Sequence, residues 1–246
     1  MTEVINIMRH ESVFNPAEYN YPVHIIGAGA TGSRVFAALL ELGMKQIHVY
    51  DYDDVESHNL ANQIYTAADI GHSKVMGCTE FAKRKLGVEK LPEGYQFHRI
   101  RVTESFLSAN LNMLGGIVFI LTDTMASRKT IFESLERRCK NYSPDAPLLI
   151  IETRMASTHG SVFTINPFDK AACEAWKTTL VDDTDEDAIE LSPCGTALSV
   201  GTTASLIANY AVWQMMHFFV DPVGMQPHID LYFKPTLTIT SPAIAA

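Results

Sequence analysis

The clearest absence in this sequence is that of paired cysteines. Only four cysteines occur in 246 residues, and none belongs to a C-x-x-C pair: Cys78, Cys139, Cys173 and Cys194. This spacing argues against a thiolate zinc site, which needs closely spaced ligands. Scattered single thiols are typical of proteins in a reducing compartment, so we expect a cytoplasmic protein.

Positive charge is also scarce. The chain has 19 Lys and Arg against 28 Asp and Glu, a formal net charge of −9. This balance argues against a nucleic-acid partner, because binding to the phosphate backbone depends on Lys and Arg. Residues 1–11 contain no apolar core typical of a secretory signal.

A long uncharged segment runs from Cys194 to Val220, which is long enough to cross a membrane. Polar side chains interrupt it, among them Thr202, Asn209 and Gln214. We therefore predict no membrane span, but a helix buried in a core or in a dimer interface. Its many large apolar residues exceed one amphipathic stripe: Trp213, Met215, Met216, Phe218 and Phe219. Part of that surface should therefore meet another subunit or the C-terminal strands, and we predict a homodimer.

The strongest local pattern is the segment Val23–Asp53. A short β-branched run ends at Ile26, the glycine motif GAGATG follows at 27–32, and a helical apolar pattern leads to a second strand that ends on Asp51. A G-x-G-x-x-G motif between a strand and a helix is typical of nucleotide binding. Gly27 permits the tight turn, Gly29 lets the backbone approach a phosphate, and Gly32 lets the helix pack close to the strand. Asp51 is placed to bind a ribose.

The rest of the chain continues this alternation of strands and helices. We predict helices at 73–86, 126–139, 170–180 and 197–219, buried strands at 117–121 and 148–153, an antiparallel strand at 161–166 and closing strands within 228–240. The pattern predicts an α/β fold with a Rossmann-like, doubly wound, mostly parallel sheet that antiparallel strands continue. We expect one domain over 1–246: an N-terminal arm (1–21), a nucleotide-binding part (22–155), and a C-terminal elaboration (156–246) with an acidic loop and the long apolar helix.

Several polar residues stand where ligands bind in such sheets. Asp51 and Asp53 end the second strand, and Asp123 follows a buried strand. Asp123 could bind magnesium shared with phosphates, or it could cap the following helix. Lys74 begins a helix, an unfavourable place for a cation unless it has an anionic partner, although it could also be an ordinary surface lysine. Asp53, with Asp54, could equally belong to a solvated loop.

Cys194 precedes Gly195 and the long uncharged helix. A thiol at a helix N-terminus has a lowered pKa and more thiolate, which would suit a nucleophile. A small buried apolar cysteine is an equally good interpretation. Cys173 lies at helical spacing from Trp176 and is predicted to be a core residue.

These motifs occur together in one superfamily. GAGATGS at 27–33, DYD at 51–53, NL at 59–60 with Gln63, DIGHSK ending at Lys74, LTD at 121–123 with Arg128, and PCG at 193–195 stand in order. In this set the chain resembles the ubiquitin-activating enzymes and their bacterial adenylyltransferase relatives of the ThiF/MoeB/HesA type. The resemblance covers about 22–217.

The resemblance implies ATP and Mg²⁺ as cofactors, and activation of the C-terminal carboxylate of a small ubiquitin-like or sulfur-carrier protein. Lys74, Asp123 and Cys194 would be catalytic, with Asp123 on the metal and Cys194 as a possible thioester nucleophile. The cofactor-binding residues would be Gly27, Gly29, Gly32, Asp51, Asp53, Asn59, Gln63 and Lys74. Members of the family also dimerise.

One departure from the family pattern concerns catalysis. The family usually reads N-L-x-R-Q, but Asn62 replaces the arginine here. Arg9 or Arg34 could supply the lost charge. The substitution keeps a second hypothesis open, a catalytically weak homologue that binds a nucleotide or a partner. A third, an NAD-dependent oxidoreductase, is favoured by the glycine motif and Asp51 but leaves Lys74 and Asp123 without a role.

Overall fold

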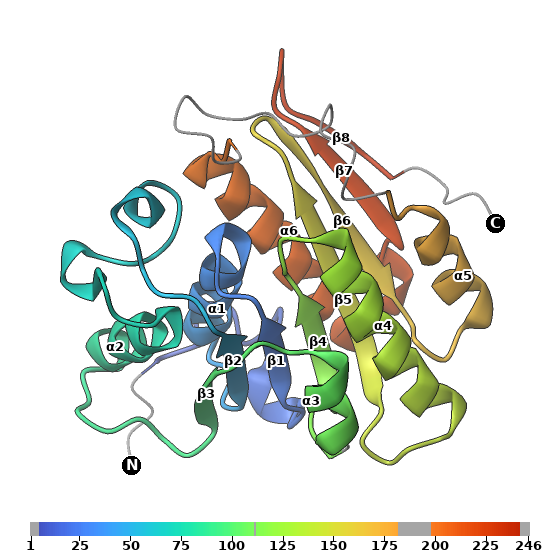
Figure 1. The fold of residues 1–246 in the computed structure, drawn as a ribbon, viewed down its shortest axis with the longest axis horizontal. Helices are drawn as coiled ribbons and strands as arrows, with labels where there is room; N and C mark the ends of the chain where they lie inside the picture. The colour runs from blue at the N-terminus through green and yellow to red at the C-terminus, as the bar shows by residue number, and fades with distance from the viewer. Residues whose placement is uncertain (1–4, 111, 182–197, 242–246) are drawn as a thin grey trace.

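The computed structural model describes residues 5–110, 112–181 and 198–241. Its centre is an eight-stranded sheet of order β3-β2-β1-β4-β5-β6-β7-β8 (Figure 1). The parallel strands are β1 (Val23–Ile26), β2 (Ile47–Asp51), β3 (Tyr95–Arg99), β4 (Gly116–Ile120) and β5 (Pro147–Met155). The antiparallel strands are β6 (His159–Ile165), β7 (His228–Tyr232) and β8 (Thr238–Thr240). The predicted α/β class, with a parallel core continued by antiparallel strands, is confirmed.

Helices cover both faces of the sheet, as a doubly wound fold requires (Figure 1). On one face lie α1 (Ala30–Leu42), α2 (Lys74–Leu86) and α6 (Gly201–Val220). On the other lie α3 (Glu104–Ala109), α4 (Met125–Lys140) and α5 (Lys170–Thr178). Each set packs its apolar side chains against the sheet, so the hydrophobic core consists of two layers. Cys173 and Trp176 are both buried in the second layer, as predicted.

The helix boundaries show how much local sequence decides. Ser73 caps α2 by accepting the N–H of Met76, and Gly87 ends the helix with φ +64°. Both signals are visible in the sequence, and the predicted helix is confirmed. The short helix α3 was not predicted. Thr103 caps it, but six residues carry too little periodicity to identify.

The long uncharged helix α6 is largely covered by its own chain. It packs against α1, β5 and β6, and Met215 and Met216 are buried. Near its end the ring of Phe219 stacks on Tyr19 of the N-terminal segment, with centroids 4.5 Å apart. Trp213 remains 48% exposed. No helix in the described part of the chain is long and apolar enough to cross a membrane.

The site region follows from the strand order. From β1 the chain continues to β2 and β3 on one side, whereas β4 and β5 lie on the other side of β1. β1 and β4 are therefore neighbours whose connections diverge, which leaves a crevice at their carboxyl ends.

Candidate functional site

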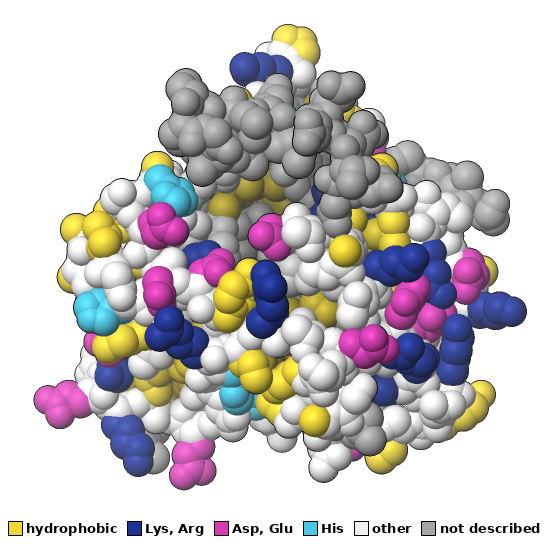
Figure 2. Space-filling view, viewed as in Figure 1, with side chains coloured by type: hydrophobic (Ala, Val, Ile, Leu, Met, Phe, Trp, Pro, Cys, Tyr) yellow, Lys and Arg dark blue, Asp and Glu magenta, His cyan; other side chains and the backbone are white. Residues whose placement is uncertain are grey.

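A cavity of about 390 Å³ opens at this crevice. Residues that end β1, β2, β3 and β4 line it together with the start of α4. Acidic and basic side chains stand close together near the centre of the face that Figure 2 shows. Six of the predicted site residues line the cavity: Gly27, Gly29, Asp51, Asp53, Lys74 and Asp123.

The glycine turn has the conformation that its sequence demands. Gly27 has φ +100°, and a Cβ there would lie 2.5 Å from the carbonyl oxygen of Leu121. A Cβ on Gly32 would lie 1.9 Å from the carbonyl oxygen of Gly27, so Gly32 serves close helix–strand packing and does not line the cavity. Gly29 has open space around its Cβ position and faces the cavity. The turn therefore offers backbone, free of side chains, to a ligand.

Asp51 is tied to the turn from the neighbouring strand. Its carboxylate accepts the N–H of Ala28 at 2.6 Å and the N–H of Asp53 at 2.8 Å. Burial raises the pKa of Asp51, whereas Lys74 and the two backbone N–H groups oppose this effect. Each carboxylate oxygen keeps a second acceptor position, so Asp51 can still accept hydrogen bonds from a ligand.

Lys74 pairs with an anionic side chain, as its unfavourable place at a helix start led us to expect. Its ammonium donates to the Asp53 carboxylate at 2.8 Å, and both side chains line the cavity. The Lys74 side chain is only 11% exposed. The lysine is therefore not an ordinary surface residue, and Asp53 is not merely part of a solvated loop.

Asp123 lies on the opposite wall of the cavity, after β4. It does not cap α4, because the Thr124 side chain performs that role by accepting the N–H of Ser127. The capping alternative for Asp123 is wrong for this reason. Its carboxylate is exposed at the cavity.

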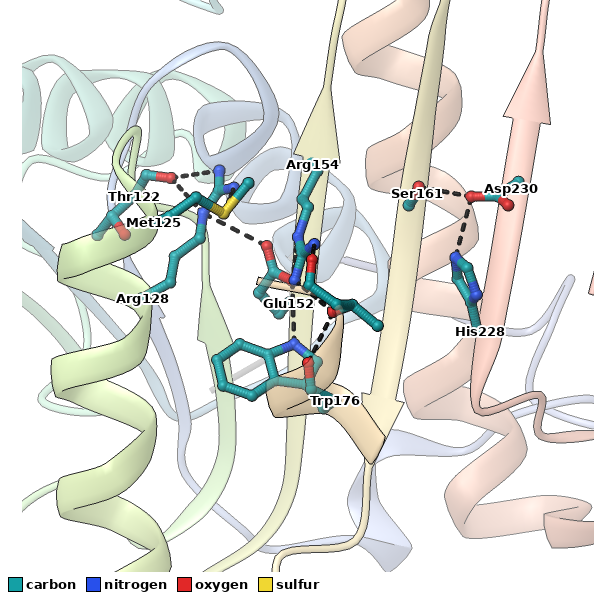
Figure 3. Close-up of polar contacts among 10 residues, drawn as sticks. Thr122, Met125, Arg128, Glu152, Arg154, Ser161, Trp176, His228 and Asp230 are labelled. Carbon is teal, nitrogen blue, oxygen red and sulfur yellow. Dashed lines mark hydrogen bonds and ion pairs between the residues drawn. The ribbon is translucent and has the colours of Figure 1, made fainter. Parts of the chain in front are cut away.

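A buried charge cluster holds the wall that carries Asp123 (Figure 3). The Arg128 guanidinium donates to the carbonyl oxygen of Thr122 at 2.9 and 2.6 Å. Glu152, fully buried on β5, lies 3.3 Å from Arg128 and accepts hydrogen bonds from Arg154 and Trp176. One buried carboxylate thus holds two guanidinium groups, one of which fixes the carbonyl next to Asp123.

Two other predicted residues, Asn59 and Gln63, lie away from the cavity. Asn59 is buried in the 3₁₀ helix at Ser57–Ala61, where its side chain accepts the N–H of Glu56. Neither Asn59 nor Gln63 lines the cavity. Cys194 lies outside the described residues.

At position 62, where the family usually has an arginine, another arginine lies close by. Arg34 on α1 donates to the backbone carbonyl of Asn62 at 3.2 Å. Its guanidinium thus lies beside position 62, although it does not line the cavity. Arg9 is exposed on the N-terminal segment and does not line it either.

Several cavity residues escaped sequence reasoning, among them Tyr52 and Arg101. The Arg101 guanidinium lies 4.3 Å from the centroid of the Tyr52 ring. Tyr52 stands inside the DYD motif, which was a usable signal. Arg101 carried none, because only the parallel pairing of β2 with β3 brings the ends of these strands together.

The described cysteines are unsuited to nucleophilic roles. Burial raises the pKa of Cys78 to about 12 and that of Cys139 and Cys173 to about 11. A thiol with such a pKa carries almost no thiolate near neutral pH. No group of three or more His, Cys, Asp or Glu in the described ranges could hold a metal ion by itself.

Comparison with solved structures shows the same fold in several proteins. PaaA matches with a TM-score of 0.68 and 15% identity, over 96% of this chain and 67% of PaaA. MccB of E. coli with ATP matches with a TM-score of 0.66 and 13% identity, over 100% of this chain and 74% of MccB. The microcin C7 biosynthetic enzyme MccB with N-formylated MccA matches with a TM-score of 0.70 and 13% identity, with the same coverage. Identities this low show the fold alone.

No curated protein matches the chain by sequence. The model of the ThiF family matches residues 19–241, which includes every described wall of the cavity. The chain therefore belongs to the ThiF family.

Proposed function

We propose that this protein is an ATP-dependent adenylyltransferase that activates the C-terminal carboxylate of a small ubiquitin-like or sulfur-carrier protein. The observation that carries the proposal is the meeting of four features at one cavity: the glycine turn, Asp51, the pair Lys74–Asp53, and Asp123. MccB, which shares the fold, has been solved with ATP and with MccA.

Each wall has a distinct part in this proposal. The glycine turn and the N-terminus of α1 offer backbone N–H groups to phosphates. Asp51 accepts hydrogen bonds from the ribose, with its free acceptor positions. Lys74, held by Asp53, neutralises phosphate charge, and Tyr52 with Arg101 forms a flat boundary for the base. In the family pattern Asn59 and Gln63 also belong to the cofactor set, and here they would act by shaping the loop that precedes Lys74.

The charges of the cavity fit a magnesium nucleotide. Among the described residues, its lining has the carboxylates of Asp51, Asp53, Asp123 and Glu104 and two basic side chains, Lys74 and Arg101. A bare triphosphate would be repelled by this excess of negative charge. Mg²⁺ is commonly bound by one or two carboxylates, phosphates and water, a set that Asp123 and the ligand could provide. When bound, Mg²⁺ neutralises charge on the phosphates.

The reaction divides into two steps. The substrate carboxylate oxygen attacks the α-phosphate, the bond to the β-phosphate breaks, and pyrophosphate leaves an acyl-adenylate behind. Positioning and charge neutralisation by the chain supply most of the catalysis. Cys194, whose thiolate could then displace AMP to form a thioester, stays a prediction from the family motif.

A second function, nucleotide or partner binding without turnover, is favoured by Asn62. The Asn62 side chain is uncharged, so it does not replace the charge of a phosphate-binding arginine, and among the described residues its buried oxygen has no hydrogen-bond partner. Arg34 stands beside it and could take over that charge. If Arg34→Met loses ATP–pyrophosphate exchange activity while its stability is unchanged, Arg34 supplies the charge of the missing arginine.

Calorimetry with ATP–Mg²⁺, AMP and NAD tests the proposed function. We expect ATP–Mg²⁺ to bind and NAD not to bind. Asp123→Ala should weaken ATP binding about tenfold in magnesium and leave it nearly unchanged in EDTA, because only the metal bridge is lost. Asp145→Ala is the matched control. Asp145 lies just before β5, at the amino ends of the parallel strands, whereas the cavity lies at their carboxyl ends. If wild type and Asp123→Ala both bind ATP equally well with and without magnesium, Asp123 has no role in metal binding.

The assembly and location are proposals as well. We infer a cytoplasmic homodimer whose contact includes the exposed Leu206 and Trp213 on one face of α6. The other large apolar residues of this helix no longer support the inference, because its own chain covers most of them. Trp213→Glu should shift the mass measured by light scattering from dimer to monomer, and a monomeric wild type would exclude the dimer.

A further inference from the structure

We propose that Tyr65 is a positioning residue that sets the direction of the Gly29 N–H toward the phosphates of a bound nucleotide. The inference rests on the proposed function for the identity of the ligand. Tyr65 precedes α2 and is only 5% exposed. It does not line the cavity, so it acts through the glycine turn.

The hydroxyl of Tyr65 donates to the carbonyl oxygen of Ala28 at 2.7 Å. On the other side of the same residue, the N–H of Ala28 donates to Asp51 at 2.6 Å. Ala28 is itself fully buried. Both of its backbone polar groups are therefore held, one by a strand end and one by a tyrosine that is distant in the sequence.

This arrangement controls the next peptide group. In a planar trans peptide the C=O and the following N–H point in opposite directions. Because Tyr65 draws the Ala28 carbonyl into the interior, the Gly29 N–H points the other way, and Gly29 lines the cavity. The described residues offer the Gly29 N–H no hydrogen-bond acceptor. A donor without an acceptor at the ligand edge suits an anion such as a phosphate.

Helix α2 fixes the tyrosine in turn. A Cβ on Gly77 would lie 2.6 Å from the Tyr65 ring, so only glycine lets the ring lie this close to the helix. The Cys78 sulfur lies 3.6 Å from the hydroxyl. Burial raises the pKa of Tyr65 well above its ordinary value, so the hydroxyl keeps its proton and remains a donor.

The test compares two tyrosine hydroxyls that each donate to a backbone carbonyl. Tyr65→Phe removes the bond to Ala28, and Tyr95→Phe removes a bond of 2.9 Å to Met44, away from the cavity. We expect Tyr65→Phe to weaken ATP–Mg²⁺ binding about five- to tenfold, the range of one lost hydrogen bond. Tyr95→Phe should leave it unchanged. Adenosine, which lacks phosphates, should bind wild type and both variants equally.

Gly77→Ala supplies an independent variant, because the added methyl group pushes the ring while the hydroxyl remains. It should reproduce the loss of ATP affinity. Equal ATP affinity in wild type and Tyr65→Phe, or an equal loss for adenosine, would overturn the inference.

A second readout needs no nucleotide. The amide signal of Gly29 in a ¹⁵N–¹H spectrum should shift in Tyr65→Phe and stay in place in Tyr95→Phe. If wild type binds no ATP, the proposed function fails, whereas the orientation of the Gly29 amide is still decided by this spectrum. An unchanged Gly29 signal in Tyr65→Phe would overturn the positioning role.

Discussion

The two walls of the cavity are built in different ways. The wall between β1 and β2 takes its shape from backbone conformation, with Gly27, Gly32 and the carboxylate of Asp51 all within one βαβ unit. The wall after β4 depends on buried charges, because Arg128 holds the Thr122 carbonyl and Glu152 on another strand holds Arg128. A local motif thus builds one wall, and a tertiary charge cluster builds the other.

The largest effect should come from breaking the charged wall. Glu152→Gln leaves the guanidinium groups of Arg128 and Arg154 buried without their carboxylate, so we expect about 3–5 kcal/mol of destabilisation in urea unfolding. Glu174→Gln is the matched control, since Glu174 pairs with Lys177 while its side chain is 55% exposed. An exposed pair contributes about 0–1 kcal/mol. Comparable losses in the two variants would show that the buried cluster does not support this wall.

Breaking the backbone wall should cost somewhat less. Gly32→Ala places a methyl group 1.9 Å from the Gly27 carbonyl oxygen, so the helix must move away from the strand. We expect a loss of about 3 kcal/mol in unfolding free energy. Gly29→Ala has open space and should cost less than about 1 kcal/mol while still weakening phosphate binding. A Gly32→Ala variant as stable as Gly29→Ala would contradict the packing role of Gly32.

Mild acid should lower the unfolding free energy by the smallest amount, and it acts through β1, the strand that leads into the glycine turn. His24 on β1 is buried against His48 and the Tyr50 hydroxyl, and burial with the neighbouring His48 lowers its pKa to about 3. Because the folded-state pKa is lowered, the unfolded chain takes up the proton first. Stability should therefore fall as pH drops below about 6.5, by about 1 kcal/mol for this group between pH 6.5 and 5.5.

His24→Phe should reduce this dependence between pH 6.5 and 5.5, measured by urea unfolding at each pH. The exposed His159 provides the control, and His159→Gln should keep the wild-type slope. A wild-type slope in His24→Phe would place the acid sensitivity elsewhere.

These differences explain which site residues could be predicted. Asp51, Asp53 and Lys74 stand next to strand ends or helix starts, which local sequence patterns identify. Asp123 was recognisable from the buried strand before it. Asn59 and Gln63 carry the family motif but do not line the cavity, because the loop folds into a 3₁₀ helix that uses the Asn59 side chain.

The sequence by itself determined the α/β class, the glycine turn, the boundaries of α2 and the carboxylates at the strand ends, because caps, glycine conformations and apolar periodicity act within a few residues. Only the tertiary structure decided that Arg101 meets Tyr52, that Glu152 holds Arg128, and that Tyr65 holds Ala28. Each of these contacts joins residues 24 or more positions apart. Such contacts depend on strand order and helix packing, which no local pattern specifies.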